Sequence, residues 1–165
     1  MYKDELAIIS QAILNEVEGR EFYLMASAQS ASKGTKEAFL ELADEERKHE
    51  EYLKKLWNEL SGESEFNIES ILESGIEIPS PEIYNWGKVD KDNISSTMSV
   101  FSIGMQMEQE SVAFYENVKS KVSSRASKEL FDLLIKWENV HLTQFNEQYK
   151  LLKEEWWSYQ DFAPF

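Results

Sequence analysis

Residues 46–49 read Glu-Arg-Lys-His, and residues 138–141 read Glu-Asn-Val-His. His49 and His141 are the only two histidines in the 165 residues, and they lie 92 positions apart (141 − 49). A glutamate and a histidine three positions apart lie on one helix face, about one turn apart, so each unit can present an oxygen and a nitrogen to the same point. The two units therefore predict a pair of helices that face a common site.

The spacing of 92 residues extends outward from these units. It relates Glu16 to Glu108 (108 − 16) and Tyr23 to Tyr115 (115 − 23), with no gap in either stretch. An internal repeat is the economical explanation. Four glutamates and two histidines thus occur as a duplicated set, which is the inventory of a site for two metal ions.

Each copy of the repeat has the pattern of a helix, a turn and a second helix. Apolar residues recur at helical spacing, and glycine or small polar residues interrupt them at 32–35 and at 123–127. The sequence therefore predicts two helical hairpins, one at about 3–60 and one at about 94–156.

The segment 61–93 between the hairpins holds two of the three prolines and three of the six glycines. It is predicted to be a crossover that can run the length of a bundle helix, roughly 38 Å for about 25 residues. The predicted fold class is all-α, a four-helix bundle of two hairpins joined by this long crossover, in one domain that spans 1–165. The aromatic tail at 157–165 is expected to pack on the bundle or on a second subunit.

A heptad pattern assigns the inward faces and places the candidate metal ligands among apolar residues. The predicted inward residues are Phe39, Leu42, Glu46, His49, Leu53, Leu56, Leu60, Phe131, Leu134, Glu138, His141, Phe145, Gln148 and Leu152 on the second and fourth helices, and Ile9, Ala12, Glu16, Gly19, Tyr23, Ala26, Phe101, Gly104, Glu108, Ser111, Tyr115 and Val118 on the first and third.

Burying an ionised carboxylate costs several kcal/mol, so four glutamates at one level of a core require cations or protons. Two divalent cations balance four glutamates. The remaining acidic runs, including Glu50-Glu51, are predicted to lie on solvated helix faces. Arg20 and Arg47 are expected to form exposed ion pairs along the helices.

Composition and charge exclude several classes of function. A formal net charge of −14 and a pI near 4.6 repel phosphate backbones and anionic membrane surfaces. Cysteine is absent from the sequence, which excludes disulfides, iron–sulfur ligands and a thiol nucleophile. The first residues lack an apolar run long enough for a signal peptide or a spanning helix, so a cytoplasmic protein with no nucleic-acid or membrane partner is expected.

The glutamate and Phe-Tyr pattern at 16–23, followed by Glu-x-x-His at 46–49 and repeated 92 residues later, resembles the ferritin-like di-iron carboxylate proteins, most closely the rubrerythrins. The resemblance implies a four-helix bundle that binds two iron ions, although manganese and zinc also suit carboxylate and imidazole ligands. The ligands that it implies are bridging Glu46 and Glu138, terminal Glu16 and His49 on one iron, and terminal Glu108 and His141 on the other.

The same resemblance implies an oxidoreductase that reduces peroxide or dioxygen, with Tyr23 and Tyr115 donating hydrogen bonds to the ligands or the oxidant. Rubrerythrins usually carry a cysteine-ligated rubredoxin domain, so this cysteine-free chain would take its electrons from a separate protein. Rubrerythrins also usually have a further glutamate where this sequence has Ser111. Ferroxidase or iron-handling activity and a non-catalytic metal-binding bundle are the alternatives. A homo-oligomer, most simply a homodimer, is expected.

Overall fold

The computed structural model describes residues 2–62 and 93–160, and these residues form four α-helices. The helices are α1 (Lys3–Gln29), α2 (Lys33–Ser61), α4 (Ile94–Lys119) and α5 (Arg125–Tyr159). The predicted all-α, ferritin-like four-helix bundle is confirmed. Most of the predicted crossover and the end of the predicted tail lie outside the described residues.

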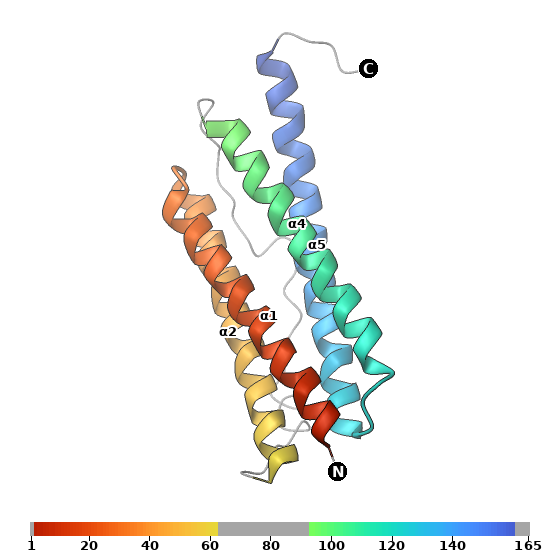
Figure 1. Ribbon diagram of the computed structural model, residues 1–165. Helices are drawn as coiled ribbons and strands as arrows, with labels where there is room; N and C mark the ends of the chain where they lie inside the picture. Colours follow the sequence, from red (N-terminus) through yellow and green to blue (C-terminus); the bar gives the residue numbers. More distant parts are fainter. Residues whose placement is uncertain (1, 63–92, 161–165) are drawn as a thin grey trace.

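The four helices pack as two antiparallel hairpins, α1 with α2 and α4 with α5 (Figure 1). In the view of Figure 1, α1 and α5 run upward while α2 and α4 run downward. The end of α2 and the start of α4 therefore lie at opposite ends of the bundle. A ferritin-like topology requires this arrangement, because one long connection must relate its two hairpins.

A serine side chain caps the N-terminus of the second helix of each hairpin. The Ser32 hydroxyl accepts a hydrogen bond from the Thr35 N–H at 3.4 Å, and the Ser124 hydroxyl accepts one from the Ser127 N–H at 2.9 Å. The predicted turns are therefore placed slightly too late, because their last residues already form the first helical turn. Gly62 ends α2 with φ 84°, a left-handed conformation that glycine adopts without strain.

Two apolar clusters lie on either side of the layer that holds the candidate ligands. One contains Ile9 and Leu53, and the other contains Tyr23 and Phe39, so Glu16 on α1 falls between the clusters along its helix. Nearly all predicted inward residues are buried, whereas Leu60, Ser111 and Gln148 are only half-buried. No helix within residues 2–62 and 93–160 is both long and apolar enough to cross a membrane.

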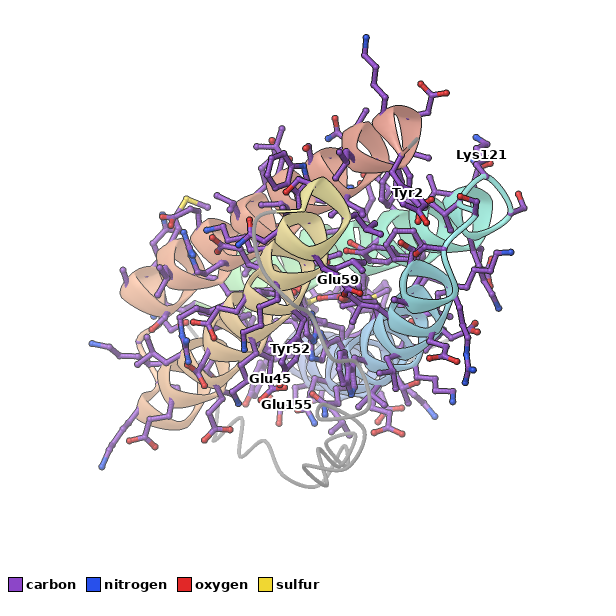
Figure 2. All side chains as sticks on the ribbon, turned by 90° about the horizontal axis from the view of Figure 1, so that it is seen from below. Tyr2, Glu45, Tyr52, Glu59, Lys121 and Glu155 are labelled. Carbon is purple, nitrogen blue, oxygen red and sulfur yellow. The ribbon has the colours of Figure 1, made fainter. Side chains whose placement is uncertain are left out.

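The start of α1 lies next to the turn between α4 and α5. Figure 2 shows Tyr2 and Lys121 together at this end of the bundle. The buried Glu5 carboxylate accepts hydrogen bonds from the N–H groups of Ser123 at 3.0 Å and of Ser124 at 3.3 Å. One side chain of the first hairpin thus caps the first turn of the last helix, where a negative charge is favourable.

Two hydroxyl groups complete the contact of Glu5. They belong to Ser123, at 2.9 Å, and to Ser127. Burial alone would raise the pKa of Glu5, but these hydrogen bonds outweigh it, with that from Ser127 the largest, and lower the pKa. The carboxylate is therefore held in its ionised form.

Candidate metal centre

Every helix of the bundle contributes side chains to one buried polar layer. The layer consists of the six predicted ligands, and each of them is at most 3% exposed. They are Glu16 from α1, Glu46 and His49 from α2, Glu108 from α4, and Glu138 and His141 from α5. Isolated ionised carboxylates are not stable at this depth, so the six groups must share protons or hold cations.

The six side chains form two overlapping groups, and the ligand atoms within each group lie within 4.8 Å of one another. One group adds Glu16 and His49 to a shared pair of glutamates, and the other adds Glu108 and His141. The shared pair is Glu46 and Glu138. Two adjacent ion positions with two carboxylates between them are what this arrangement offers.

His49 directs one ring nitrogen at the carboxylates of three different helices. Its Nδ1 lies 3.2 Å from Glu16 Oε2, 3.1 Å from Glu46 Oε2 and 3.1 Å from Glu138 Oε1. This convergence of one nitrogen and three oxygens, drawn from both hairpins, could hold a metal ion.

His141 occupies the corresponding place in the other group. Its Nδ1 lies 3.3 Å from Glu46 Oε1, 3.5 Å from Glu138 Oε2 and 3.6 Å from Glu108 Oε2. The two imidazole rings stack with their centroids 5.8 Å apart. The 92-residue repeat therefore reappears in space as two matched halves of one site.

Burial and the close contacts within the layer shift the pKa values of its side chains in different directions. Burial, together with the nearby Glu138 carboxylate, raises the pKa of Glu16 and of Glu108 well above the usual value. Burial opposes charge on His49 and His141, but the surrounding carboxylates outweigh it and raise both pKa values. The close contacts of Glu138 with the His141 and His49 imidazoles likewise outweigh burial and lower its pKa.

The two predicted tyrosines contact the layer by crossing between the hairpins. The Tyr23 hydroxyl of α1 donates to Glu108 of α4, and the Tyr115 hydroxyl of α4 donates to Glu16 of α1. Burial raises the pKa of Tyr115 well above its usual value, and the Glu16 carboxylate adds to the shift, so this phenol stays protonated at neutral pH. Each tyrosine therefore contacts the glutamate of the opposite hairpin that belongs to only one of the two groups.

Sequence reasoning missed Trp137, which is 2% exposed and stacks on His49 with ring centroids 5.0 Å apart and planes 8° apart. The available signal was its position three residues after inward-facing Leu134. Trp137 covers the ring face of one candidate ligand and restricts how that ring can rotate.

The prediction that Glu50 lies on a solvated face is wrong, because its side chain is 7% exposed. Arg20 reaches it from α1, and Lys54 reaches it along α2. Two cations thus compensate the burial of one carboxylate. Arg47, as predicted, forms ion pairs along its own exposed helix face.

A metal pair fits the chemistry of the layer. Oε1 of Glu46, Oε1 of Glu138 and Nδ1 of His141 are buried, and the contacts of 3.1–3.6 Å between imidazole nitrogen and carboxylate oxygen at these atoms do not have hydrogen-bond geometry. All three are electron-pair donors, and carboxylate oxygen and imidazole nitrogen are ligands for iron, manganese and zinc. The four helices therefore define a ferritin-like bundle with a buried carboxylate and histidine centre.

A family model described as Rubrerythrin matches residues 7–149. The chain belongs to this family, whose model spans both hairpins and all six candidate ligands. Among solved structures, a hypothetical protein from Pyrococcus furiosus is 25% identical and superposes with a TM-score of 0.68. That match covers 90% of this chain and 89% of the other. No curated protein matches the sequence.

Proposed function

We propose that this protein is a di-iron oxidoreductase that reduces peroxide or dioxygen. The observation that carries the proposal is the sharing of Glu46 and Glu138 between two groups of potential ligand atoms. Membership of the rubrerythrin family supports iron as the metal. When bound, a ferrous pair supplies the two electrons that reduction of hydrogen peroxide to two waters requires, and the two protons come from the solvent or the protein.

The proposed ligand roles follow from the two groups. Glu46 and Glu138, which belong to both groups of ligand atoms, would be shared by the two ions. Glu16 and His49 would hold one ion, and Glu108 and His141 would hold the other. The four negative charges of the glutamates would then balance the four positive charges of two divalent cations. The layer would no longer need protons to offset its carboxylates.

The tyrosines have a proposed part in positioning. Tyr23 and Tyr115 each donate a hydrogen bond to a glutamate of the layer, and such contacts orient ligands and tune their affinity. The same hydroxyl groups are the proposed hydrogen-bond donors to the oxidant.

The partners are proposed from the same chemistry. The oxidant is a small molecule, peroxide or dioxygen. We propose a separate protein as the electron donor. A homo-oligomer is proposed as well, and light scattering of the purified protein measures its size.

The decisive experiment is anaerobic loading of the metal-free protein with ferrous iron, followed by metal analysis and an absorption spectrum before and after peroxide. We expect two irons per chain and oxidation by peroxide much faster than that of the same iron in buffer. The matched control is the double variant H49A/H141A, which lacks both nitrogen ligands. Equal oxidation rates in protein and buffer would refute catalysis and leave a binding bundle. Release of ferric iron after each turnover would instead identify a ferroxidase.

A further inference from the structure

A cavity of about 120 Å³ opens between α1 and α4 and reaches the buried layer. Its inner wall includes Glu16, Glu108 and the two shared glutamates, Glu46 and Glu138. Its outer wall includes Glu18 and Glu110, which are exposed. The cavity therefore joins the protein surface to the carboxylates of the candidate metal centre.

The inner end of the cavity presents carboxylate oxygens whose hydrogen-bonding capacity is not satisfied. Oε1 of Glu46 and Oε1 of Glu138 each have an imidazole nitrogen nearby, at 3.3 and 3.1 Å, but neither contact has hydrogen-bond geometry, and both residues line the cavity. The two side chains are 3% and 1% exposed. A cation that enters the cavity thus meets buried carboxylate oxygens that are free to bind it.

The outer end of the cavity carries two carboxylates, those of Glu18 and Glu110. Among residues 2–62 and 93–160, neither of them forms an ion pair with a lysine, arginine or histidine. Glu110 accepts a hydrogen bond from the neutral Gln106 amide at 2.9 Å. By contrast, the exposed Glu21 on α1 pairs with Arg20. Uncompensated carboxylates at the mouth of a cleft raise the local concentration of cations.

The two mouth residues are related by the repeat. Glu18 and Glu110 lie 92 positions apart (110 − 18), the same spacing as Glu16 and Glu108. Each mouth residue stands two positions after the glutamate ligand of its own helix. The mouth therefore has one carboxylate from each half of the protein, placed alike with respect to the two ion positions.

We propose that the cavity between α1 and α4 is the port through which divalent cations enter, and that Glu18 and Glu110 hold the cation at its mouth. The cation then passes to Glu16 and Glu108 and on to the bridging carboxylates. The proposal rests on the metal centre proposed above and adds a route and two residues outside the ligand set.

The test measures Co²⁺ uptake by the metal-free protein in a stopped-flow spectrophotometer, with visible absorption reporting bound cobalt. We expect the variant E18Q/E110Q to bind the same number of ions about 10-fold more slowly at low salt. The difference shrinks in high salt, because exposed charges are screened. The matched control is E41Q/E116Q, which removes two exposed carboxylates of α2 and α4 away from the cavity.

Equal uptake rates for E18Q/E110Q and its control would overturn the port while leaving the metal centre in place. Wild-type protein that takes up no Co²⁺ would overturn the metal centre and the port with it. The two failures are therefore distinguishable.

A steric variant tests the route without changing charge. Ser111 lines the cavity and is half-buried, so Ser111→Leu narrows it and should slow Co²⁺ uptake at both low and high salt. Gln109→Leu is the control, because Gln109 is exposed on the same helix and does not line the cavity. Circular dichroism checks that both variants keep their helical content. Wild-type uptake by Ser111→Leu would show that cations enter elsewhere.

Discussion

Replacing Glu5 by glutamine removes one charge from the contact between the two hairpins with little change of shape. The carboxylate accepts hydrogen bonds from two backbone N–H groups and two hydroxyls at the start of α5. Hydrogen bonds to a charged group contribute about 1.5–3 kcal/mol, and charge at a helix N-terminus adds about 0.3–1 kcal/mol. Glutamine keeps one acceptor oxygen but turns an N–H₂ group toward donors. We therefore expect Glu5→Gln to lower the free energy of unfolding by about 2 kcal/mol.

The sign of the pH dependence follows from the lowered pKa of Glu5. A carboxylate whose pKa is lower in the folded state stabilises the fold above its ordinary pKa of 4.5, and this contribution is lost as the pH falls through the folded value. The difference between wild type and Glu5→Gln should thus be full at about pH 7 and should shrink progressively as the pH falls below 4.5. Urea unfolding of the metal-free protein at a series of pH values measures it.

Asp4→Asn is the control for this experiment. Asp4 is exposed in the same helical turn and carries the same charge, but it lacks the contact with the serines. It should change the unfolding free energy by only a few tenths of a kcal/mol. If Glu5→Gln and Asp4→Asn behaved alike at neutral pH, or if the difference persisted in acid, the assignment of Glu5 as a charged cap would be refuted.

Three further predictions concern the core and the metal centre. Gly104→Ala should destabilise the protein by about 1–3 kcal/mol, despite the better helix propensity of alanine, because the new Cβ would lie 2.9 Å from the buried Phe145 ring; thermal unfolding measures this, and a stabilised variant would contradict it. His141→Ala should weaken metal binding at one of the two ion positions and leave the other unchanged. The number of Co²⁺ ions bound per chain should then fall from two to one, as measured by metal analysis of the cobalt-loaded protein. An unchanged number would remove His141 from the ligand set. Tyr23→Phe should lower metal affinity by about 10- to 100-fold through the loss of its bond to Glu108, as measured by competition with a chelator, and equal affinity would exclude the positioning role.

Gly19→Ala is a matched control for the core prediction. A Cβ on Gly19 would lie 3.6 Å from Glu46 Cγ, an ordinary van der Waals distance. The substitution should therefore stabilise the fold by up to about 1 kcal/mol through helix propensity alone. The two glycine variants differ mainly in what the added methyl group meets.

The sequence contained most of what determines the bundle, because helical periodicity is a local property. On α1 the inward pattern from Ile9 through Glu16 to Ala26 agrees with burial at every predicted position. Helix starts were less accurate, since the serine that caps a helix and the residues of its first turn have similar composition. Thus Lys33 belongs to α2, although it falls in the predicted turn.

Contacts between residues far apart in the sequence could not be predicted from hydrophobic periodicity and motif spacing. Nothing local to Glu5 shows that serines more than a hundred residues later will donate to it. Burial of Glu50 depends on Arg20 reaching across from another helix. The tyrosines were predicted near the ligands, but their crossing to the opposite half depends on how the hairpins pack. The ligand assignment and the single-domain organisation stay predictions until metal and stability are measured.

The hydrogen bonds that cross between the two hairpins bear on how the repeat arose. Since Tyr23 serves Glu108 while Tyr115 serves Glu16, neither hairpin carries a self-sufficient centre. Two copies of a single hairpin, related by a twofold axis, would nonetheless supply every group that the present layer contains. A gene half this length could therefore have encoded a working dimer before tandem fusion made the partnership permanent, and afterwards each half was free to diverge, as Gly19 and Ser111 have done.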